Sequence, residues 1–277
     1  MRSLSNTIVI NSKKGDSVSF KELWLYRELF YFFAWRDIKV RYKQTAIGAG
    51  WAILQPLIAT AIFSVIFNRI VGVETGSHVP YPVFAYVGLM YWNLFSSAIN
   101  TISNSLVSNQ GVITKIYFPR LIPPLSSALV SIVDFFFAGI VFIGLLVVFQ
   151  VFPNLLLGAL FGFLALILIT VFAVGFGTFL AAVNVKYRDV KSAVPFLIQI
   201  LMYTSPIIYP MSIIPAQFQL LAYANPAAGA VSLVRAGLFG TPVDAVGMLI
   251  STTVAVAILI IALWYFKKAE KGFADII

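Results

Sequence analysis

Long uncharged, apolar blocks alternate with short basic segments along this chain. A helix needs about 20 consecutive apolar residues to cross a bilayer, and most of the blocks reach that length. Because polarity does not alternate within them, the blocks predict helices and not the strands of a barrel. The predicted fold class is therefore all-α, a polytopic membrane protein with six transmembrane helices. These spans are predicted at residues 47–67, 79–103, 121–152, 155–185, 194–209 and 245–266.

Two regions precede the first predicted span. Residues 1–19 are polar, lack the apolar stretch of a signal peptide and are expected to be mobile. Residues 20–46 are rich in aromatic and charged side chains, so they are too polar to span and predict a helix that lies in the membrane interface. Residues 47–277 are predicted to form a single transmembrane domain.

The charges of the chain predict its orientation. Charged residues make up 10% of the sequence, against about 25% in soluble domains. With six spans and both termini on one side, only Arg69 and Arg235 of the 19 basic residues fall on the other side. Since Lys and Arg accumulate in cytoplasmic loops, both termini are predicted to be cytoplasmic. The net charge of +9 then faces anionic lipid headgroups and does not indicate nucleic acid.

The predicted cytoplasmic loop at residues 110–124 combines apolar and basic side chains with three prolines. Pro119 ends any helix that enters it, so a short helix is predicted at about 112–118. Exposed apolar side chains in such a turn indicate a protein-binding surface, although they would also fit against the bilayer. The side chains concerned are Ile113, Ile116, Tyr117 and Phe118. The loop at 184–191 is compact and charged, which is typical of a solvated turn.

The predicted outer segment at residues 206–242 is rich in proline yet largely apolar. It predicts two short helices, at about 216–224 and 228–239, separated by Asn225 and Pro226. At 1.5 Å per residue neither crosses a bilayer, so the segment predicts a re-entrant hairpin. Non-helical backbone at membrane depth is tolerated only when it is buried in protein or lines a water-filled cavity, which indicates a transport pathway.

Several strings of the sequence match a known family in order and spacing. They are RDIKVRYKQTAIGAGWAILQPL (36–57), ITKIYFPR (113–120), NVKYRDV (184–190), SPIIYP (205–210) and the Asn225-Pro226 pair followed by Arg235. Together they resemble the permease subunits of ABC-2 type polysaccharide exporters, which move O-antigen, capsule or teichoic acid chains. The resemblance covers about residues 20–270.

The resemblance implies a permease in a bacterial inner membrane. Two copies of the chain would form the pore, and two separate ATP-binding cassette subunits would dock below and bind ATP and Mg²⁺. The cargo would be a lipid-linked polysaccharide, with O-antigen preferred. The sequence has no G-x-x-x-x-G-K-[ST] phosphate loop, so the chain is expected to be neither an enzyme nor the holder of a cofactor. With no cysteine and one histidine, no metal site is expected.

The resemblance also implies roles for three sets of residues. The first set would couple the permease to the ATPase: Ile113, Thr114, Lys115, Tyr117, Phe118, Pro119 and Arg120. The second would form the interface helix: Arg36, Asp37, Lys39, Arg41 and Tyr42. The third would form the external gate: Asn225, Pro226 and Arg235.

A channel for a sugar polymer needs rings that offer apolar faces to C–H groups and polar tips to hydroxyls. The aromatic candidates are Tyr81, Tyr86, Tyr91, Trp92, Phe95, Tyr203 and Tyr209. The same rings would also serve as an interfacial belt or as helix packing. Asn93, Asn100 and Asn104 share one stripe of a helix, which faces either the lumen or another helix.

Asp134 lies within the third predicted span, where a carboxylate costs roughly 2.5–3.5 kcal/mol on insertion scales. It must therefore face water or a partner. Its functional role would be to accept hydrogen bonds from sugar hydroxyls in the channel or to serve as a proton site in a coupled transporter. Its structural role would be to bond to a neighbouring helix, with the asparagines of residues 93–104 as partners.

Two other functions are open from the sequence. An ABC-2 exporter of small drugs or lipids would need a narrower site with fewer aromatic side chains. An ion-coupled secondary transporter would need discontinuous midplane helices with charges, which the sequence does not indicate.

Overall fold

The computed structural model describes residues 20–43, 50–72, 75 and 79–273. Within these residues every regular element is a helix, which confirms the predicted all-α class. The predicted mobility of residues 1–19 lies outside the described residues, and so does His78.

The helices follow the predicted blocks closely. The region predicted to be interfacial forms two helices, α1 (Phe20–Leu25) and α2 (Arg27–Lys43). The first apolar block forms α3 (Gly50–Phe63), which continues as the π-helix η1 (Ser64–Ile70). The rest of the chain forms α4 (Tyr81–Ser108), α5 (Gln110–Ile113), α6 (Ile122–Val148), α7 (Leu155–Lys186), α8 (Val190–Tyr203), the 3₁₀ helix η2 (Met211–Ile213), α9 (Ala216–Ala222), α10 (Pro226–Phe239) and α11 (Ala245–Glu270).

Local chemistry explains where several of these helices begin and end. Asn154 and Asp244 cap α7 and α11, because their side-chain oxygens accept hydrogen bonds from backbone N–H groups of the first turn. Asn225 caps α10 in the same way, and Pro226 fills the first helical position. Gly240 ends α10 with a φ of 69°, a left-handed conformation that glycine adopts without strain.

Four helical stretches of the described chain are long and apolar enough to cross a membrane: Ile53–Ile70, Ile122–Val148, Leu155–Lys186 and Ala245–Glu270. The predicted spans at 79–103 and 194–209 fall on α4 and α8, which are not among them. The 14 residues of α8 extend only about 21 Å. Helix α4 is long but carries many Asn, Ser and Thr side chains.

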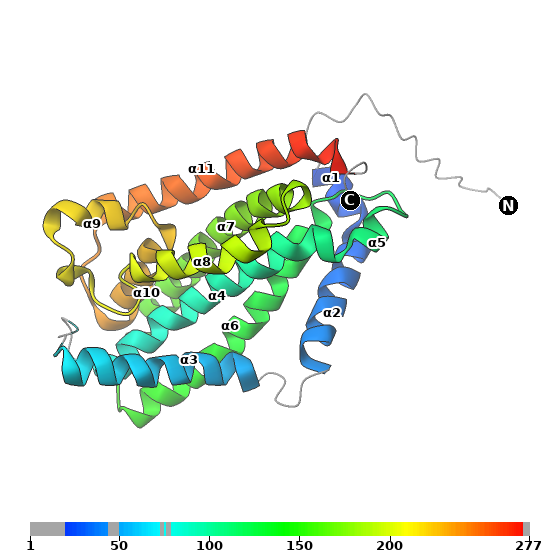
Figure 1. Ribbon diagram of the computed structural model, residues 1–277. Helices are drawn as coiled ribbons and strands as arrows, with labels where there is room; N and C mark the ends of the chain where they lie inside the picture. The colour runs from blue at the N-terminus through cyan, green and yellow to red at the C-terminus, as the bar shows by residue number, and fades with distance from the viewer. Residues whose placement is uncertain (1–19, 44–49, 73–74, 76–78, 274–277) are drawn as a thin grey trace.

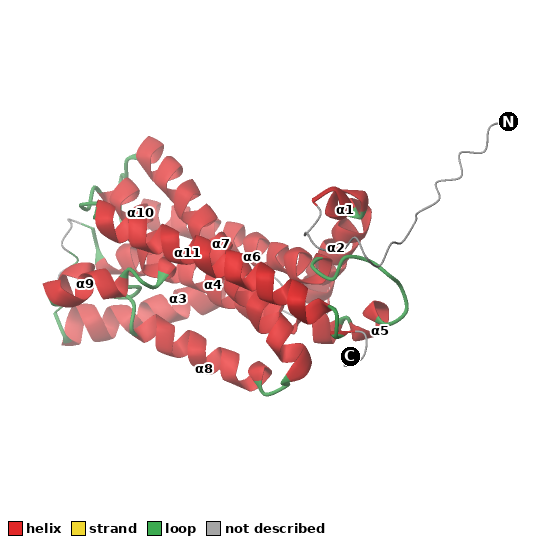
Figure 2. Ribbon diagram, turned by 90° about the horizontal axis from the view of Figure 1, so that it is seen from above, coloured by secondary structure: helices red, strands yellow, loops and turns green. Residues whose placement is uncertain are grey.

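Helix α4 lies at the centre of the bundle, with α6, α7, α10, α3 and α8 packed around it (Figure 1). Most of its residues are buried. Polar side chains on a helix surrounded by protein do not meet lipid, so its polarity is compatible with membrane depth. Helix α8 lies on the outside of the bundle against α4 and α7 (Figure 2).

The two ends of the bundle differ in content. Helices α1 and α5 lie at the same end of the bundle as the C-terminal end of α11, whereas α9 lies at the opposite end (Figure 1). At the first end Phe33, Phe118, Phe266 and Phe273 form part of one buried apolar cluster. Near the other end α10 packs closely on α7, because Gly237 has no side chain to keep the two backbones apart. A Cβ at this position would stand only 2.6 Å from the carbonyl oxygen of Leu157.

Candidate functional site

The loop at residues 113–120, hereafter the 113–120 loop, is folded back on the protein. Helix α5 ends at Ile113, so the helix predicted at 112–118 is wrong. The chain turns instead because the Arg120 guanidinium donates to the carbonyl of Ile113. The backbone N–H of Arg120 also donates to a carboxylate oxygen of Glu270 at 3.2 Å.

This turn divides the apolar side chains of the loop into two groups. Ile113 and Phe118 are each 1% exposed, which corrects the prediction that they face outward. Ile116 and Tyr117 are 49% and 59% exposed, and Thr114 and Lys115 are exposed beside them. Pro119 and Arg120 are partly buried. The surface that the loop offers to a partner is therefore narrower than the sequence predicts.

Helix α2 lies against this loop and against α6. The Phe33 ring lies 5.7 Å from the Phe118 ring, and the Arg36 guanidinium lies 4.8 Å from the centre of the Phe33 ring. Arg36 also donates to Asp37, at 2.6 Å, and to the side-chain oxygen of Asn109, the residue between α4 and α5, at 2.7 Å. Lys39 is exposed. Of the predicted interface residues, Arg36 thus ties α2 to the bundle.

Asp134 finds its partners at the C-terminal end of α2. Its carboxylate pairs with the Arg41 guanidinium at 2.5 Å and accepts a hydrogen bond from the Tyr42 hydroxyl. Burial, followed by the hydrogen bond to Asp134, raises the pKa of Tyr42, so its hydroxyl remains a donor at neutral pH. The bonding of Asp134 to a neighbouring helix was one of the two sequence readings, but the partners are not the asparagines of α4.

A cavity of about 290 Å³, hereafter the polar cavity, lies beside this ion pair between α2, α3, α4 and α6. Asn93 and Asn100 line it, as the predicted stripe requires, whereas Asn104 does not. The Asn104 side chain instead lies 3.5 Å from the amide nitrogen of Asn184 on α7. The other polar side chains in its wall are Arg41, Gln55, Ser96, Ser97, Thr101 and Asp134. The cavity offers hydroxyl and amide groups suited to a hydrogen-bonding ligand.

The aromatic side chains of α4 pack inside the protomer. Tyr81, Tyr86, Tyr91, Trp92 and Phe95 are each at most 3% exposed. The hydroxyls of Tyr86 and Tyr91 donate to the carbonyls of Ala138 and Gly162 at 3.0 and 2.8 Å. A second copy of the chain would only bury these rings further. Their burial agrees with the packing alternative, and a channel-lining role stays a prediction.

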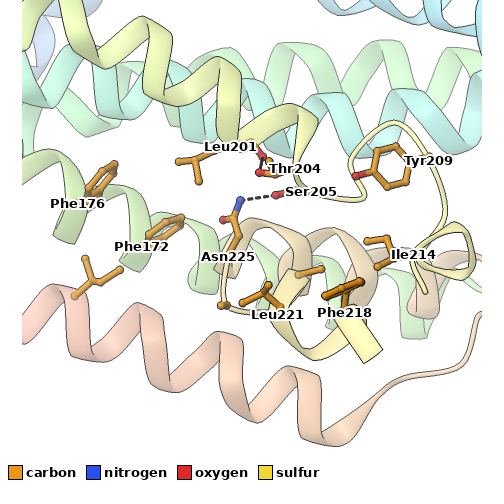
Figure 3. Close-up of a pocket in the computed structure, with 13 residues that line it drawn as sticks. Phe172, Phe176, Leu201, Thr204, Ser205, Tyr209, Ile214, Phe218, Leu221 and Asn225 are labelled. Atoms are coloured by element: carbon orange, nitrogen blue, oxygen red, sulfur yellow. Dashed lines mark hydrogen bonds between the residues drawn. The ribbon is translucent and has the colours of Figure 1, made fainter. Parts of the chain in front are cut away.

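A second cavity, hereafter the apolar cavity, has a volume of about 590 Å³ and lies between α7, α8, α9 and α11. Figure 3 shows Phe172 and Phe176 on one side, Phe218 and Leu221 on another, and Tyr209 near the α8–α9 loop. The Tyr209 hydroxyl donates to the Tyr203 carbonyl at 3.1 Å. The Tyr203 side chain is exposed.

The residues predicted for the external gate hold α10 in place. The Asn225 amide donates to the Ser205 hydroxyl at 2.6 Å, an interaction drawn in Figure 3. Arg235 is 5% exposed and donates to the carbonyls of Pro206, Ile207 and Phe84 at 2.6–3.1 Å. Its guanidinium also lies 3.6 Å from the centre of the Phe84 ring. Arg235 therefore joins α10, α4 and the turn after α8.

Some of these features carry no signal in the sequence. Arg41 and Tyr42 both contact Asp134, although Tyr42 and Asp134 are 92 positions apart in the sequence. No local sequence pattern reveals a contact over that separation. The wall of the polar cavity includes Ser96, Ser97 and Thr101, which sequence reasoning did not select. Their position on the face of α4 that carries Asn93 and Asn100 was the available signal.

Comparison with known proteins places the chain in a family. Residues 28–239 match the family described as ABC-2 type transporter. An O-antigen export system permease protein RfbA of Klebsiella pneumoniae is 28% identical over 244 residues, which cover 87% of this chain and 92% of the relative.

Two further relatives extend the match. A protein of the same name from Myxococcus xanthus is 26% identical over 259 residues, covering 92% of this chain and 97% of the relative. The polysialic acid transport protein KpsM of Escherichia coli is 26% identical over 213 residues, covering 72% of this chain and 77% of the relative. Because the family match spans most of the sequence, this chain belongs to the ABC-2 type transporter family.

Proposed function

We propose that this chain is the permease subunit of an ABC transporter that exports a lipid-linked polysaccharide, with O-antigen as the preferred cargo. The observation that carries this proposal is the similarity, over most of both chains, to permeases named for O-antigen export and to one named for polysialic acid transport. The chain is a multi-pass inner-membrane protein and, as a member of the ABC-2 family, a transport subunit and not an enzyme.

The proposed arrangement has six spans with both termini in the cytoplasm. Helices α4 and α8 supply the two spans that length and apolar composition alone do not identify. Helix α4 is covered by its neighbours, and α8 would be covered by a second copy of the chain in a homodimer. The short helices α9 and α10 would form a re-entrant hairpin at the outer face, held by Arg235 and Asn225.

ATP and Mg²⁺ would bind to a separate pair of ATP-binding cassette subunits, since this sequence lacks a phosphate-binding loop. The exposed part of the 113–120 loop, from Thr114 to Tyr117, would seat in that partner. Exposed apolar side chains beside Lys115 are typical of a protein-docking surface. Arg36, Asp37, Lys39, Arg41 and Tyr42 would form the adjacent interface helix.

The polymer path would use the polar cavity in place of the buried aromatic side chains. Asn93 and Asn100 present amides there, and Asp134 forms part of the wall. Such groups hydrogen-bond sugar hydroxyls without gripping a single residue of the polymer. Tyr203 and Tyr209 would act nearer the outer face.

Purification from the native host tests this proposal. The detergent-solubilised chain should copurify with a stoichiometric ATP-binding subunit. Deletion of its gene should remove one polysaccharide from the cell surface and leave that polymer inside the cell. A chain that purifies alone in several mild detergents, from a host whose surface glycans do not depend on it, would contradict the proposal.

The apolar cavity favours one alternative, an ABC-2 exporter of small drugs or lipids. Its volume of about 590 Å³ falls in the range of about 300–1,000 Å³ for small-molecule sites, and aromatic and aliphatic side chains line it. For such an exporter, the deletion would increase the accumulation of a fluorescent lipophilic dye and leave surface glycans unchanged. The two measurements on the same deletion strain separate the two functions.

A further inference from the structure

Helix α2 contacts two different functional regions along its length. Near its middle, Phe33 is buried against Phe118 of the 113–120 loop. At its C-terminal end, Arg41 and Tyr42 bind Asp134 in the wall of the polar cavity. We call these three residues, Arg41, Tyr42 and Asp134, the α2–α6 joint. One helix therefore connects the proposed ATPase-facing loop with the cavity inside the bundle.

The sequence of helix α2 favours a straight, rigid helix between these two contacts. Its sequence, RELFYFFAWRDIKVRYK, contains no glycine or proline, the usual causes of a kink. Phe33 and Tyr42 are nine positions apart, which separates them by about 14 Å along the helix axis. A displacement at Phe33 is then carried to Tyr42 as a rigid-body movement.

The α2–α6 joint differs from the Phe33–Phe118 contact in how easily it opens. The Arg41 side chain is 40% exposed, so it can exchange its carboxylate partner for water without leaving a buried cation. The Asp134 side chain is 13% exposed and faces a cavity with amide and hydroxyl groups, including those of Asn93 and Asn100. Phe33 and Phe118, in contrast, are nearly inaccessible and would expose apolar surface on separation.

We propose that α2 is a lever that moves with the 113–120 loop and opens the α2–α6 joint in each transport cycle. Arg41 and Tyr42 are positioning residues, which hold Asp134 when the joint is closed and free its carboxylate for the polar cavity when the joint opens. The proposal rests on the proposed function, because the movement at Phe118 comes from the separate ATPase.

Cross-linking tests whether the joint opens. The natural chain has no cysteine, so introduced pairs react without competition. Tyr42→Cys with Asp134→Cys crosses the joint, and Phe33→Cys with Phe118→Cys crosses the contact that stays closed. Each pair is bridged with a short bis-methanethiosulfonate reagent in the complete complex with its ATPase in nanodiscs, and ATP hydrolysis is measured before and after reduction.

The lever predicts opposite results for the two bridges, each compared with the reduced form of the same variant. Bridging the joint should lower the rate of ATP hydrolysis about tenfold, as blockage of a required conformational step does, and dithiothreitol should restore it. Loss of the two buried rings lowers the stability of the Phe33→Cys, Phe118→Cys protein itself, but bridging its cysteines should leave the rate nearly equal to that of its reduced form. An unchanged rate in the bridged joint would show a static brace, and a loss with the second bridge would show that α2 moves against the loop. Either result overturns the proposal.

A milder variant keeps the proposal testable if the reduced Tyr42→Cys, Asp134→Cys protein is itself inactive. Tyr42→Phe removes one hydrogen bond of the joint and keeps the ring on Phe137, 5.9 Å away. We expect the ratio of polymer exported to ATP hydrolysed to fall about twofold, because some cycles of ATP hydrolysis would no longer move the polymer. An unchanged ratio overturns the lever. Absence of any copurifying ATPase would instead refute the proposed function, before any bridge is made.

Discussion

Arg41 and Arg235 each join segments that are distant in the sequence, but the protein holds the two arginines in different ways. Arg41 pairs with a carboxylate and is 40% exposed. Arg235 is 5% exposed and has three carbonyl oxygens and an aromatic face as its partners. Water can replace the partner of Arg41, whereas Arg235 is nearly inaccessible to solvent. The first contact suits a connection that opens, and the second suits one that stays closed.

The same distinction separates the two helices that carry these arginines. Helix α10 packs closely on α7 at Gly237, where a Cβ would stand 2.6 Å from the Leu157 carbonyl oxygen, and on Ser251 of α11 at Gly229, so it has little room to shift. Helix α2 meets α6 through long side chains and an ion pair, which tolerate displacement. Of the two helices, α2 is therefore the one that can move relative to α6, whereas its buried contact with the 113–120 loop stays closed.

The largest expected effect comes from that buried contact. Phe118→Ala removes a ring that is 1% exposed and should lower the free energy of unfolding by about 3–5 kcal/mol. Tyr117→Ala, one position away and exposed, should change stability by no more than about 0.5 kcal/mol yet uncouple ATP hydrolysis from export. Thermal unfolding followed by size-exclusion chromatography measures the change in stability. ATPase assays of the complex measure the uncoupling of ATP hydrolysis from export. Equal melting temperatures for the two variants would contradict this division of the loop.

Arg235 should come next in magnitude. Arg235→Met leaves the carbonyls of Pro206, Ile207 and Phe84 without their side-chain donor. At about 1 kcal/mol for each carbonyl, the lower bound for an unsatisfied buried group, the total cost should be on the order of 3 kcal/mol. Arg235→Lys keeps a charge but cannot reach all three carbonyls, so it should recover only part of the loss. The melting temperatures of the two variants measure this. An Arg235→Met protein with an unchanged melting temperature would show that Arg235 is not a contact that has to stay closed.

Gly88 tests the close packing around Arg235 without touching its charge. A Cβ at this position would lie 2.3 Å from the Ile207 carbonyl oxygen and 2.7 Å from a guanidinium nitrogen of Arg235. Gly88→Ala should therefore destabilise the protein by about 1–3 kcal/mol, the usual range for overpacking. Gly139→Ala on α6 is the matched control, because a Cβ there meets nothing within 4 Å. The same melting experiment applies, and equal stability of both variants would show that the turn after α8 can shift.

The sequence predicted the helices better than their surroundings. Uncharged blocks located α7 and α11 within a few positions, because the lack of charge is a local signal. The burial of Tyr86 and Tyr91 was not predictable. A ring that lines a lumen and a ring that packs against α6 or α7 look the same in the sequence.

Polar residues at membrane depth show the same limit. The cost of Asp134 in lipid required a partner, but charge alone did not select Arg41, because the partner lies on a helix outside the predicted spans. Arg235 likewise donates to Phe84, 151 positions away. Long-range contacts of this kind follow from how the helices pack, which a single sequence does not specify.

The smallest expected effect on stability belongs to Asp134, the carboxylate partner of Arg41. Asp134→Asn removes the charged partner of Arg41 but keeps an oxygen that can accept the Tyr42 hydrogen bond. Because Arg41 is already 40% exposed, hydration should replace the ion pair at a cost of about 1 kcal/mol or less. The melting temperature should therefore stay close to that of the unaltered protein, far above that of Arg235→Met.

The functional result of Asp134→Asn should not be small. Without the ion pair, the closed state of the α2–α6 joint should no longer be favoured over the open state. The amount of polymer on the cell surface should then fall by a larger factor than the rate of ATP hydrolysis, with both measured on the same preparations of cells and complex. A loss of stability as large as that of Arg235→Met would instead place Asp134 with the fixed contacts. Arg41 and Arg235 would then differ in exposure but not in role, and the movable region would have to be sought elsewhere, beginning with the exposed faces of α8 and α9.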